Sequence, residues 1–146
     1  MIRKIETSLE WLKRPCREVM DSEDIHEVLN DLWDTFGTFD DRAAGLSANQ
    51  IGYDVRISLI KVGGIELVLI NPTIRITSTR IKFREGCLSF PGISVETSRY
   101  QDIVVEYRKD EDRIQEAWTG LIAIAIQHEV DHLDGKTMFQ RKWHAR

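Results

Sequence analysis

Apolar residues in the first third of the chain recur at spacings of three and four, which predicts an amphipathic helix. This stripe consists of Ile25, Val28, Leu29, Leu32, Trp33 and Phe36. Residues 21–24 (Asp-Ser-Glu-Asp) favour a helix start there, because a capping side chain and acidic groups suit the positive end of the helix dipole. Gly37 is expected to end the helix. The irregular residues 1–15 predict an arm over the core.

The middle of the chain has short runs rich in β-branched and aromatic residues, which predict strands. The expected strands are residues 55–62, 65–70, 74–77, 81–83, 93–95, 103–107 and 114–118. Gly63-Gly64 favours a two-residue hairpin, and residues 109–112 form a charged turn. Asn71-Pro72 is expected to end a strand, because proline cannot donate to a β-ladder. Residues 43–52, rich in small side chains, are expected to form a loop.

The most apolar run, residues 121–126, leads directly into Gln-His-Glu-Val-Asp-His at 127–132. In a helix, His128 and His132 lie one turn apart on one face and can share an ion. In a strand they would be roughly 13 Å apart, at about 3.3 Å per residue, which is too far. We therefore expect a helix over residues 120–134, with Thr119 as its cap and Gly135 as its terminator. Its β-branched content requires burial on most sides. The predicted fold class is α+β, with antiparallel strands packed around one central buried helix that carries the metal-binding motif.

Length and composition fit a single domain over residues 1–146, with 42% hydrophobic residues and a net charge of −4. This charge argues against nucleic-acid binding and against a basic membrane-binding face. We see no signal peptide and no run near the ~20 apolar residues of a membrane-spanning helix. Two cysteines, Cys16 and Cys87, are too few for a disulfide framework. We expect a cytoplasmic monomer.

A His-Glu-x-x-His pair on a helix supplies two imidazole ligands and a carboxylate that can handle a water proton. The alternative is a helix end whose polar side chains only face solvent. A catalytic site needs a third protein ligand, for which Cys87, Cys16 and a distant carboxylate are candidates. Cys87 lies in a loop punctuated by glycine and proline, whereas Cys16 fits a buried apolar role better. A Cys-His-His set favours Zn²⁺ or Fe²⁺ over calcium or magnesium.

Three segments together resemble the motifs of the peptide deformylase family, metal hydrolases that remove the formyl group from the formyl-methionine of new polypeptides. The family motifs run Gly-x-Gly-Leu-Ala-Ala-x-Gln, Glu-Gly-Cys-Leu-Ser and Gln-His-Glu-x-Asp-His-Leu. Residues 43–50 read Ala-Ala-Gly-Leu-Ser-Ala-Asn-Gln, and residues 85–89 and 127–133 match in full. The order and the spacing of the three segments match as well.

The resemblance implies one divalent ion, Fe²⁺ or Zn²⁺, held by Cys87, His128 and His132 with water as the fourth ligand. It implies Glu129 as the base that takes a proton from this water and gives it to the departing amine. It also implies the Gln50 side chain and the backbone N–H of Leu88 as donors to the developing oxyanion.

The implied substrates are N-formyl-methionyl peptides. Gly45 and Leu46 would contact the peptide backbone, while Leu121 and Ala125, on one helical face with His128, would line a pocket for the methionine side chain. Core packing is an equally good role for the last two residues.

Other residues extend or depart from this pattern. We expect Glu85 and Asp131 to orient ligands, and we interpret Arg99 as a partner for Glu85. Ala43 and Ser47 replace a glycine and an alanine of the family motif, and Ser47 adds a hydroxyl that we expect near the substrate. Ser94 stands where many relatives have an arginine that helps to hold the peptide.

Bacterial members usually continue into a C-terminal helix that helps them dock on the ribosome. This sequence stops at Arg146, so we expect a short form without that helix, and docking on the ribosome is an open possibility. Two rival functions also remain: a general metallopeptidase using the same His-Glu-x-x-His pair, and a deformylase-like binding module without catalysis.

Overall fold

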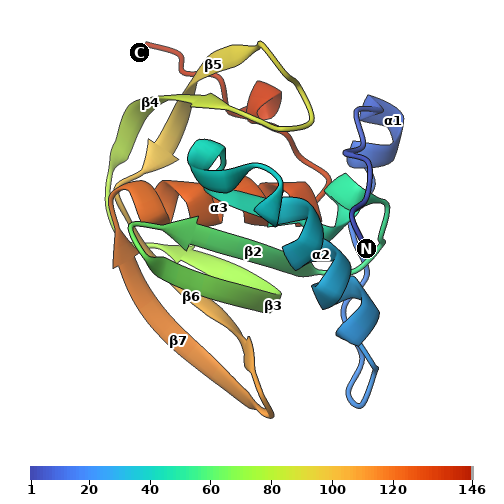
Figure 1. Cartoon of the computed structure of the whole chain (residues 1–146). Helices are drawn as coiled ribbons and strands as arrows, with labels where there is room; N and C mark the ends of the chain where they lie inside the picture. Colours follow the sequence, from blue (N-terminus) through green and yellow to red (C-terminus); the bar gives the residue numbers. More distant parts are fainter. Residues whose placement is uncertain (146) are drawn as a thin grey trace.

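A computed structural model describes residues 1–145 of the chain, without the side chain of Asp40. Figure 1 shows helix α3 enclosed between a large sheet and a smaller two-stranded sheet, with α2 on one flank. The elements in chain order are α1 (Leu9–Leu12), α2 (His26–Gly37), η1 (Asp40–Arg42), β1 (Gly45–Ser47), η2 (Ala48–Ile51), β2 (Ile57–Val62), β3 (Ile65–Ile76), β4 (Arg80–Gly86), β5 (Ser94–Tyr100), β6 (Asp102–Lys109), β7 (Asp112–Thr119), α3 (Leu121–Leu133) and η3 (Met138–Arg141), where η marks a 3₁₀ helix.

Every strand pair is antiparallel, which confirms the predicted α+β class. The large sheet has the order β1-β2-β3-β6-β7, and β4 pairs with β5 in the small sheet. Eleven of the 13 residues of α3 are buried, as its β-branched composition requires. Ile122, Ala123, Ile126 and Val130 pack against apolar residues of the large sheet. The helix is therefore the core element around which both sheets are arranged.

Strand β3 continues through Asn71-Pro72, so the prediction that a strand ends there was wrong. The register against β6 shifts between Ile70 and Thr73, and Asn71 has a φ of +51°. At this bulge Pro72 does not have to donate a hydrogen bond to the ladder. Strands tolerate proline at such positions. The Asn71 side chain bonds the backbone N–H and C=O of Val19 at 2.8 and 2.9 Å. A distant partner therefore stabilises the bulge.

Several helix boundaries also differ from the predictions. Helix α2 begins at His26, after residues 21–24, and its N-cap position Ile25 makes no side-chain capping bond. Asp24 instead contacts His26, accepting from its backbone N–H at 3.0 Å and lying 2.9 Å from its ring Nδ1. The N-cap of α3 is Gly120 at φ 74° and ψ −143°, a region that only glycine adopts readily, so Thr119 is not the cap. Gly135, at φ 75°, follows the end of α3 as predicted.

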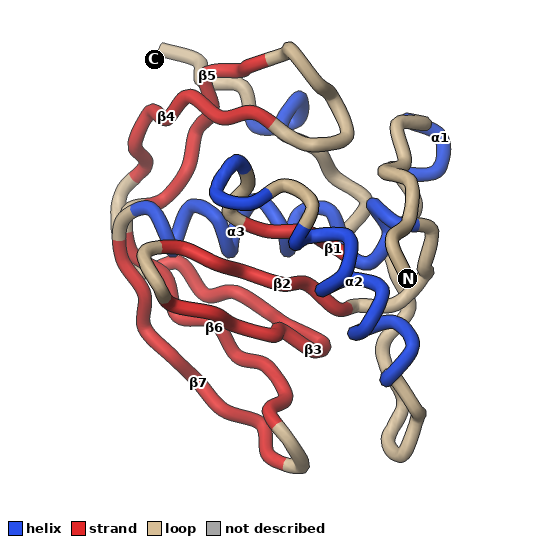
Figure 2. Tube along the Cα trace, in the orientation of Figure 1, coloured by secondary structure: helices blue, strands red, loops and turns tan. Residues whose placement is uncertain are grey.

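The segment predicted as a loop, residues 43–52, contains strand β1 and helix η2, all of whose residues are buried. Figure 2 shows β1 as a short strand beside β2, close to α3. The N-terminal arm includes α1 and is fixed to η2, since Trp11 Nε1 donates to Asn49 O at 2.7 Å. No helix of residues 1–145 is long and apolar enough to cross a membrane.

Candidate metal centre

Three potential ligand atoms converge where α3 meets the loop after β4. They belong to Cys87, His128 and His132 and lie within 4.8 Å of one another. His132 Nε2 is 3.3 Å from Cys87 Sγ and 3.3 Å from His128 Nε2. A tetrahedral ion with bonds of about 2.0–2.3 Å to nitrogen and sulfur places its ligands about 3.3–3.6 Å apart. These two spacings therefore fit a zinc-like or iron-like ion.

The orientation of His128 is set by a carboxylate behind it. His128 Nδ1 lies 2.8 Å from Glu85 Oε1. Because a carboxylate only accepts, Nδ1 carries the hydrogen and Nε2 is left for an ion. Glu85 in turn receives two bonds from Arg99, Nε to Oε2 at 2.9 Å and Nη2 to Oε1 at 2.5 Å. The pairing of Arg99 with Glu85 that the sequence suggested is thus present.

The environment shifts the ionisation of these groups in opposite directions. Burial and the neighbouring His128 lower the pKa of His132 well below its usual range, so this ring is neutral, as a metal ligand must be. Burial opposes the charged form of His128, yet the carboxylates of Glu129 and Glu85 raise its pKa well above the usual range. An ion bound here would replace the proton of His128. Burial disfavours ionised Glu85 too, but Arg99 and His128 lower its pKa to about 2.

Glu129 lies beside the three ligand atoms, with Oε2 3.9 Å from His128 Nε2. Burial raises the pKa of this carboxyl. Its other oxygen, Oε1, is 3.0 Å from the Ser47 hydroxyl, which also lies 2.7 Å from Ser58 Oγ. Ser47 thus points inward to the carboxylate, and the expectation that its hydroxyl lies near the substrate stays a prediction. A buried carboxyl held on one oxygen is suited to exchanging protons through the other.

Gly45 of β1 makes room for Glu129. A Cβ on Gly45 would lie 2.7 Å from Glu129 Cγ, 2.8 Å from its Oε2 and 2.8 Å from the backbone oxygen of Leu59. Nothing larger than glycine fits between the strand and the helix at this point. The position of the Glu129 carboxylate therefore depends on glycine at position 45 of β1.

Gln50 reaches the same site from η2. Its Nε2 lies 3.1 Å from Ser89 Oγ and 3.6 Å from Cys87 Sγ, and its Oε1 accepts from the Ser47 N–H at 3.0 Å. The side-chain amide is therefore fixed at its oxygen end and presents its N–H groups to the cysteine loop.

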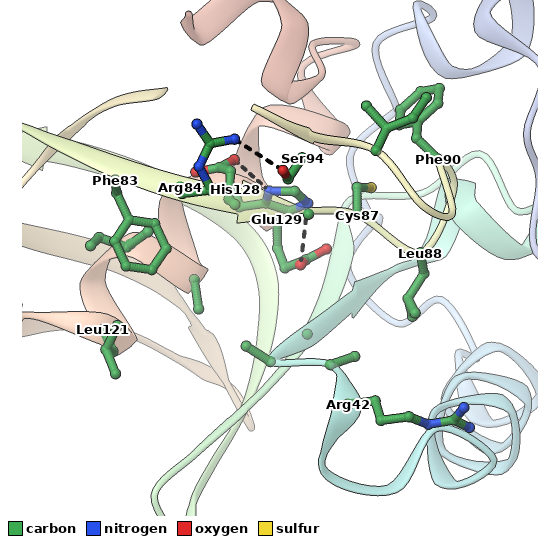
Figure 3. A pocket seen from close by; sticks show the side chains of 18 of the residues that line it. Arg42, Phe83, Arg84, Cys87, Leu88, Phe90, Ser94, Leu121, His128 and Glu129 are labelled. Atoms are coloured by element: carbon green, nitrogen blue, oxygen red, sulfur yellow. Dashed lines mark hydrogen bonds and ion pairs between the residues drawn. The ribbon is translucent and has the colours of Figure 1, made fainter. Parts of the chain in front are cut away.

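A cavity of about 500 Å³ opens beside these groups. Figure 3 shows His128 and Glu129 between Phe83 and Leu121 on one side and Cys87 and Leu88 on the other. The residues singled out in the sequence that line the cavity are Ala43, Gly45, Gln50, Glu85, Cys87, Leu88, Ser94, Leu121, Ala125, His128 and Glu129. His132 and Leu46 are fully buried instead, and the Leu46 side chain packs into the apolar core.

Sequence reasoning missed much of the apolar lining, namely Val62, Phe83, Phe90, Ile93 and Ile124. Ile124 could have been found, because it is three residues after Leu121 and four before His128 on one helical face. Leu121 is 62% exposed and so lies at the rim, whereas Ala125 is 7% exposed and lies deeper. The remaining residues come from other strands and loops, so no local pattern marks them.

A Cys-His-His cluster, a buried carboxylate and an adjoining cavity define a metal-dependent hydrolase. A model of the polypeptide deformylase family matches residues 2–145. The chain belongs to this family, whose members are metal-dependent enzymes that remove the N-formyl group from nascent polypeptides.

Individual proteins agree with this assignment. The peptide deformylase of Aquifex aeolicus is 38% identical over 141 residues, covering 90% of this chain and 82% of that protein. That of Natranaerobius thermophilus is 38% identical over 146 residues, covering 96% and 92%. The crystal structure of the Thermotoga maritima enzyme aligns with a TM-score of 0.89 at 30% identity, covering 99% of each chain. The enzyme of the Vibrio parahaemolyticus bacteriophage VP16T, in complex with actinonin, aligns with a TM-score of 0.85 at 33% identity, covering 93% and 99%.

Replacing Gly45 with alanine should displace Glu129 and lower deformylation by about 100-fold, since shifts near 1 Å at a reacting group cost this much. Turnover of a formylated peptide and bound metal should be measured together. Gly37→Ala is the matched control, because a Cβ there meets nothing within 4 Å. A fully active Gly45→Ala enzyme would show that Glu129 tolerates displacement.

The low pKa of Glu85 makes this residue a source of acid sensitivity. Its folded-state pKa of about 2 lies below the ordinary 4.5, so its stabilisation is present above about pH 4.5 and is lost as the pH falls toward 2. Glu85→Gln should reduce the free energy of unfolding by about 3 kcal/mol at pH 6, because it leaves Arg99 buried without this partner. Denaturant titrations of the metal-free proteins should show the difference from wild type shrinking at low pH. A difference independent of pH would contradict this assignment.

Proposed function

We propose that Cys87, His128 and His132 hold one divalent ion, Fe²⁺ or Zn²⁺, with which the enzyme hydrolyses the N-formyl group of formyl-methionyl peptides. The supporting observation is the convergence of the three ligand atoms within 4.8 Å at the wall of a cavity that also contains Glu129. A thiolate with two imidazoles suits either of these ions. When bound, the ion would lower the pKa of water and polarise the formyl group.

Glu129 acts as the general base in this proposal. Its Oε1 is occupied by the Ser47 hydroxyl, so Oε2, near His128 Nε2, is the oxygen that receives a proton from the attacking water. The same carboxyl then donates this proton to the departing amine. Burial raises the pKa of Glu129, which suits both steps, because the carboxyl has to accept a proton and then release it.

Gln50 and Leu88 stabilise the charge that develops on the formyl oxygen. Gln50 Nε2 carries two N–H groups, which contact Ser89 Oγ at 3.1 Å and Cys87 Sγ at 3.6 Å, and the longer contact with sulfur is the one that the formyl oxygen would replace. Leu88 directly follows Cys87 and lines the same cavity, and its backbone N–H is the second donor in this proposal. Two donors preset at this position would favour the transition state over the planar formyl group.

The peptide binds along β1 in this proposal. Among the described strands β1 pairs only with β2, which leaves its other edge free to accept an extended peptide. Gly45 lines the cavity at this edge, and Leu46 would contribute backbone groups only. The methionine side chain would contact Leu121 and Ala125 of α3 and Phe83 of β4.

Further predictions concern inhibitors and partners. Peptide deformylases of Synechococcus elongatus and of phage VP16T have been solved with actinonin, and we propose that actinonin also binds to this cavity. Docking on the ribosome, a cytoplasmic location and a monomeric state remain predictions. Family membership does not favour a general metallopeptidase or a silent binding module.

Anaerobic purification followed by loading with Fe²⁺ or Zn²⁺ tests the proposal. Each form should contain one ion per chain and should deformylate formyl-Met-Ala-Ser, with inhibition by actinonin, and neither should digest casein. Cys87→Ser should bind the ion less tightly, because it removes the thiolate ligand. Casein cleavage without deformylation would instead support the metallopeptidase.

Glu129→Gln should keep the ion but lose deformylation by about 10²–10⁴-fold, the usual contribution of a general base. Glu96→Gln on β5 is the control, since this residue lies outside the cavity and is about half exposed. Metal content and kcat should be measured on the same preparations. Unchanged turnover by the Glu129 variant would exclude it as the base.

A further inference from the structure

Four charged side chains of alternating sign run from the C-terminal 3₁₀ turn to a proposed metal ligand. Arg141 of η3 binds both oxygens of Asp131, Nε to Oδ2 at 2.9 Å and Nη2 to Oδ1 at 2.8 Å. Asp131 Oδ2 also accepts from Arg99 Nη1 at 2.6 Å. Arg99 then binds both oxygens of Glu85, which holds His128 Nδ1 at 2.8 Å.

This chain of contacts allows each side chain little freedom. Arg99, Glu85 and Asp131 have side chains that are 2%, 6% and 9% exposed, so their charges are balanced almost entirely by one another rather than by water. Two of the links are forked contacts between a guanidinium and a carboxylate, which fix angle as well as distance. The direction in which Glu85 holds His128 therefore depends on how Arg99 lies, and Arg99 depends on Asp131.

Arg141 is the outer end of this chain and its most accessible member, at 39% side-chain exposure. It lines a second cavity of about 410 Å³ together with Arg99 and Asp131. Without the Arg141 side chain, solvent from this cavity would reach the Asp131 carboxylate, and the four formal charges of the chain would no longer cancel. Asp131 would then be free to move with respect to Arg99.

We propose that Arg141 is a positioning residue for the metal centre, acting through Asp131, Arg99 and Glu85 on the orientation of His128. This inference rests on the proposed metal site. It gives the segment after α3 a specific purpose, because η3 supplies the outer contact that keeps a ligand aligned. Arg141 touches neither the cavity beside the metal centre nor the reacting groups, so it is not a catalytic residue.

The test uses Co²⁺, whose visible spectrum reports thiolate and imidazole ligation. Wild type and Arg141→Ala are loaded with Co²⁺, and loss of the ion to an excess of chelator is followed by absorbance. Residues that support a metal ligand typically change metal affinity 10–100-fold when replaced. We expect Arg141→Ala to lose Co²⁺ about 10-fold faster and to show an altered spectrum. Arg141→Lys keeps the charge but loses the forked contact with Asp131. Its rate of Co²⁺ loss should therefore lie between those of wild type and Arg141→Ala.

Arg56→Ala is the matched control. Arg56 also binds the C-terminal end of α3, at Leu133 O and Asp134 Oδ1, and it lines the same second cavity, but it has no bond to the chain of four. A general loss of stability would affect both variants alike, whereas the proposal expects the wild-type rate and spectrum for Arg56→Ala.

Equal rates of Co²⁺ loss for wild type and both Arg141 variants would overturn the proposal, and so would equal acceleration by Arg56→Ala. Should Arg141→Ala fail to fold, Arg141→Lys decides between the same outcomes. A wild-type protein that binds no Co²⁺ through Cys87 would instead overturn the proposed metal site, so the two failures are distinct.

Discussion

The arrangement of the site depends on one buried guanidinium. Arg99 is almost fully enclosed, and a charge in the interior is tolerated only when it is paired and hydrogen-bonded. Its two carboxylate partners come from different elements, Glu85 from β4 and Asp131 from α3. Cys87 follows β4 by one residue, and both histidines lie on α3. Satisfying Arg99 therefore also brings together the candidate ligands, which are some 40 residues apart in sequence.

The sequence was most informative where a local period and a chemical requirement coincide. Two histidines one turn apart can share an ion only if α3 is helical, and the apolar run before them predicts a buried helix. The bulge at Asn71 could not be foreseen, because its side chain is satisfied by Val19, 52 residues away. The buried strand β1 was also missed, because a run of three residues is too short to show a period and its strand pairing is with the distant β2.

The metal cluster was easier to anticipate than the cavity beside it. Cys87, His128 and His132 belong to short motifs whose residue types imply their chemistry, and the structure brings all three together. The apolar lining is contributed by single residues from several elements, such as Phe83 and Ile93, which look like ordinary core positions. The inward direction of Ser47 depends on Ser58 and Glu129, which are distant in sequence. Contacts of this kind follow from the assembled fold.

The shortness of β1 has a consequence for how selective this enzyme can be. A strand of three residues offers a ladder only about 10 Å long. If a peptide pairs with it as proposed, recognition would be through main-chain groups of the first few residues, and the remainder would extend beyond the strand. The identity of the downstream residues would then matter little. Such tolerance suits an enzyme whose substrates have the same N-terminal residue but different sequences after it.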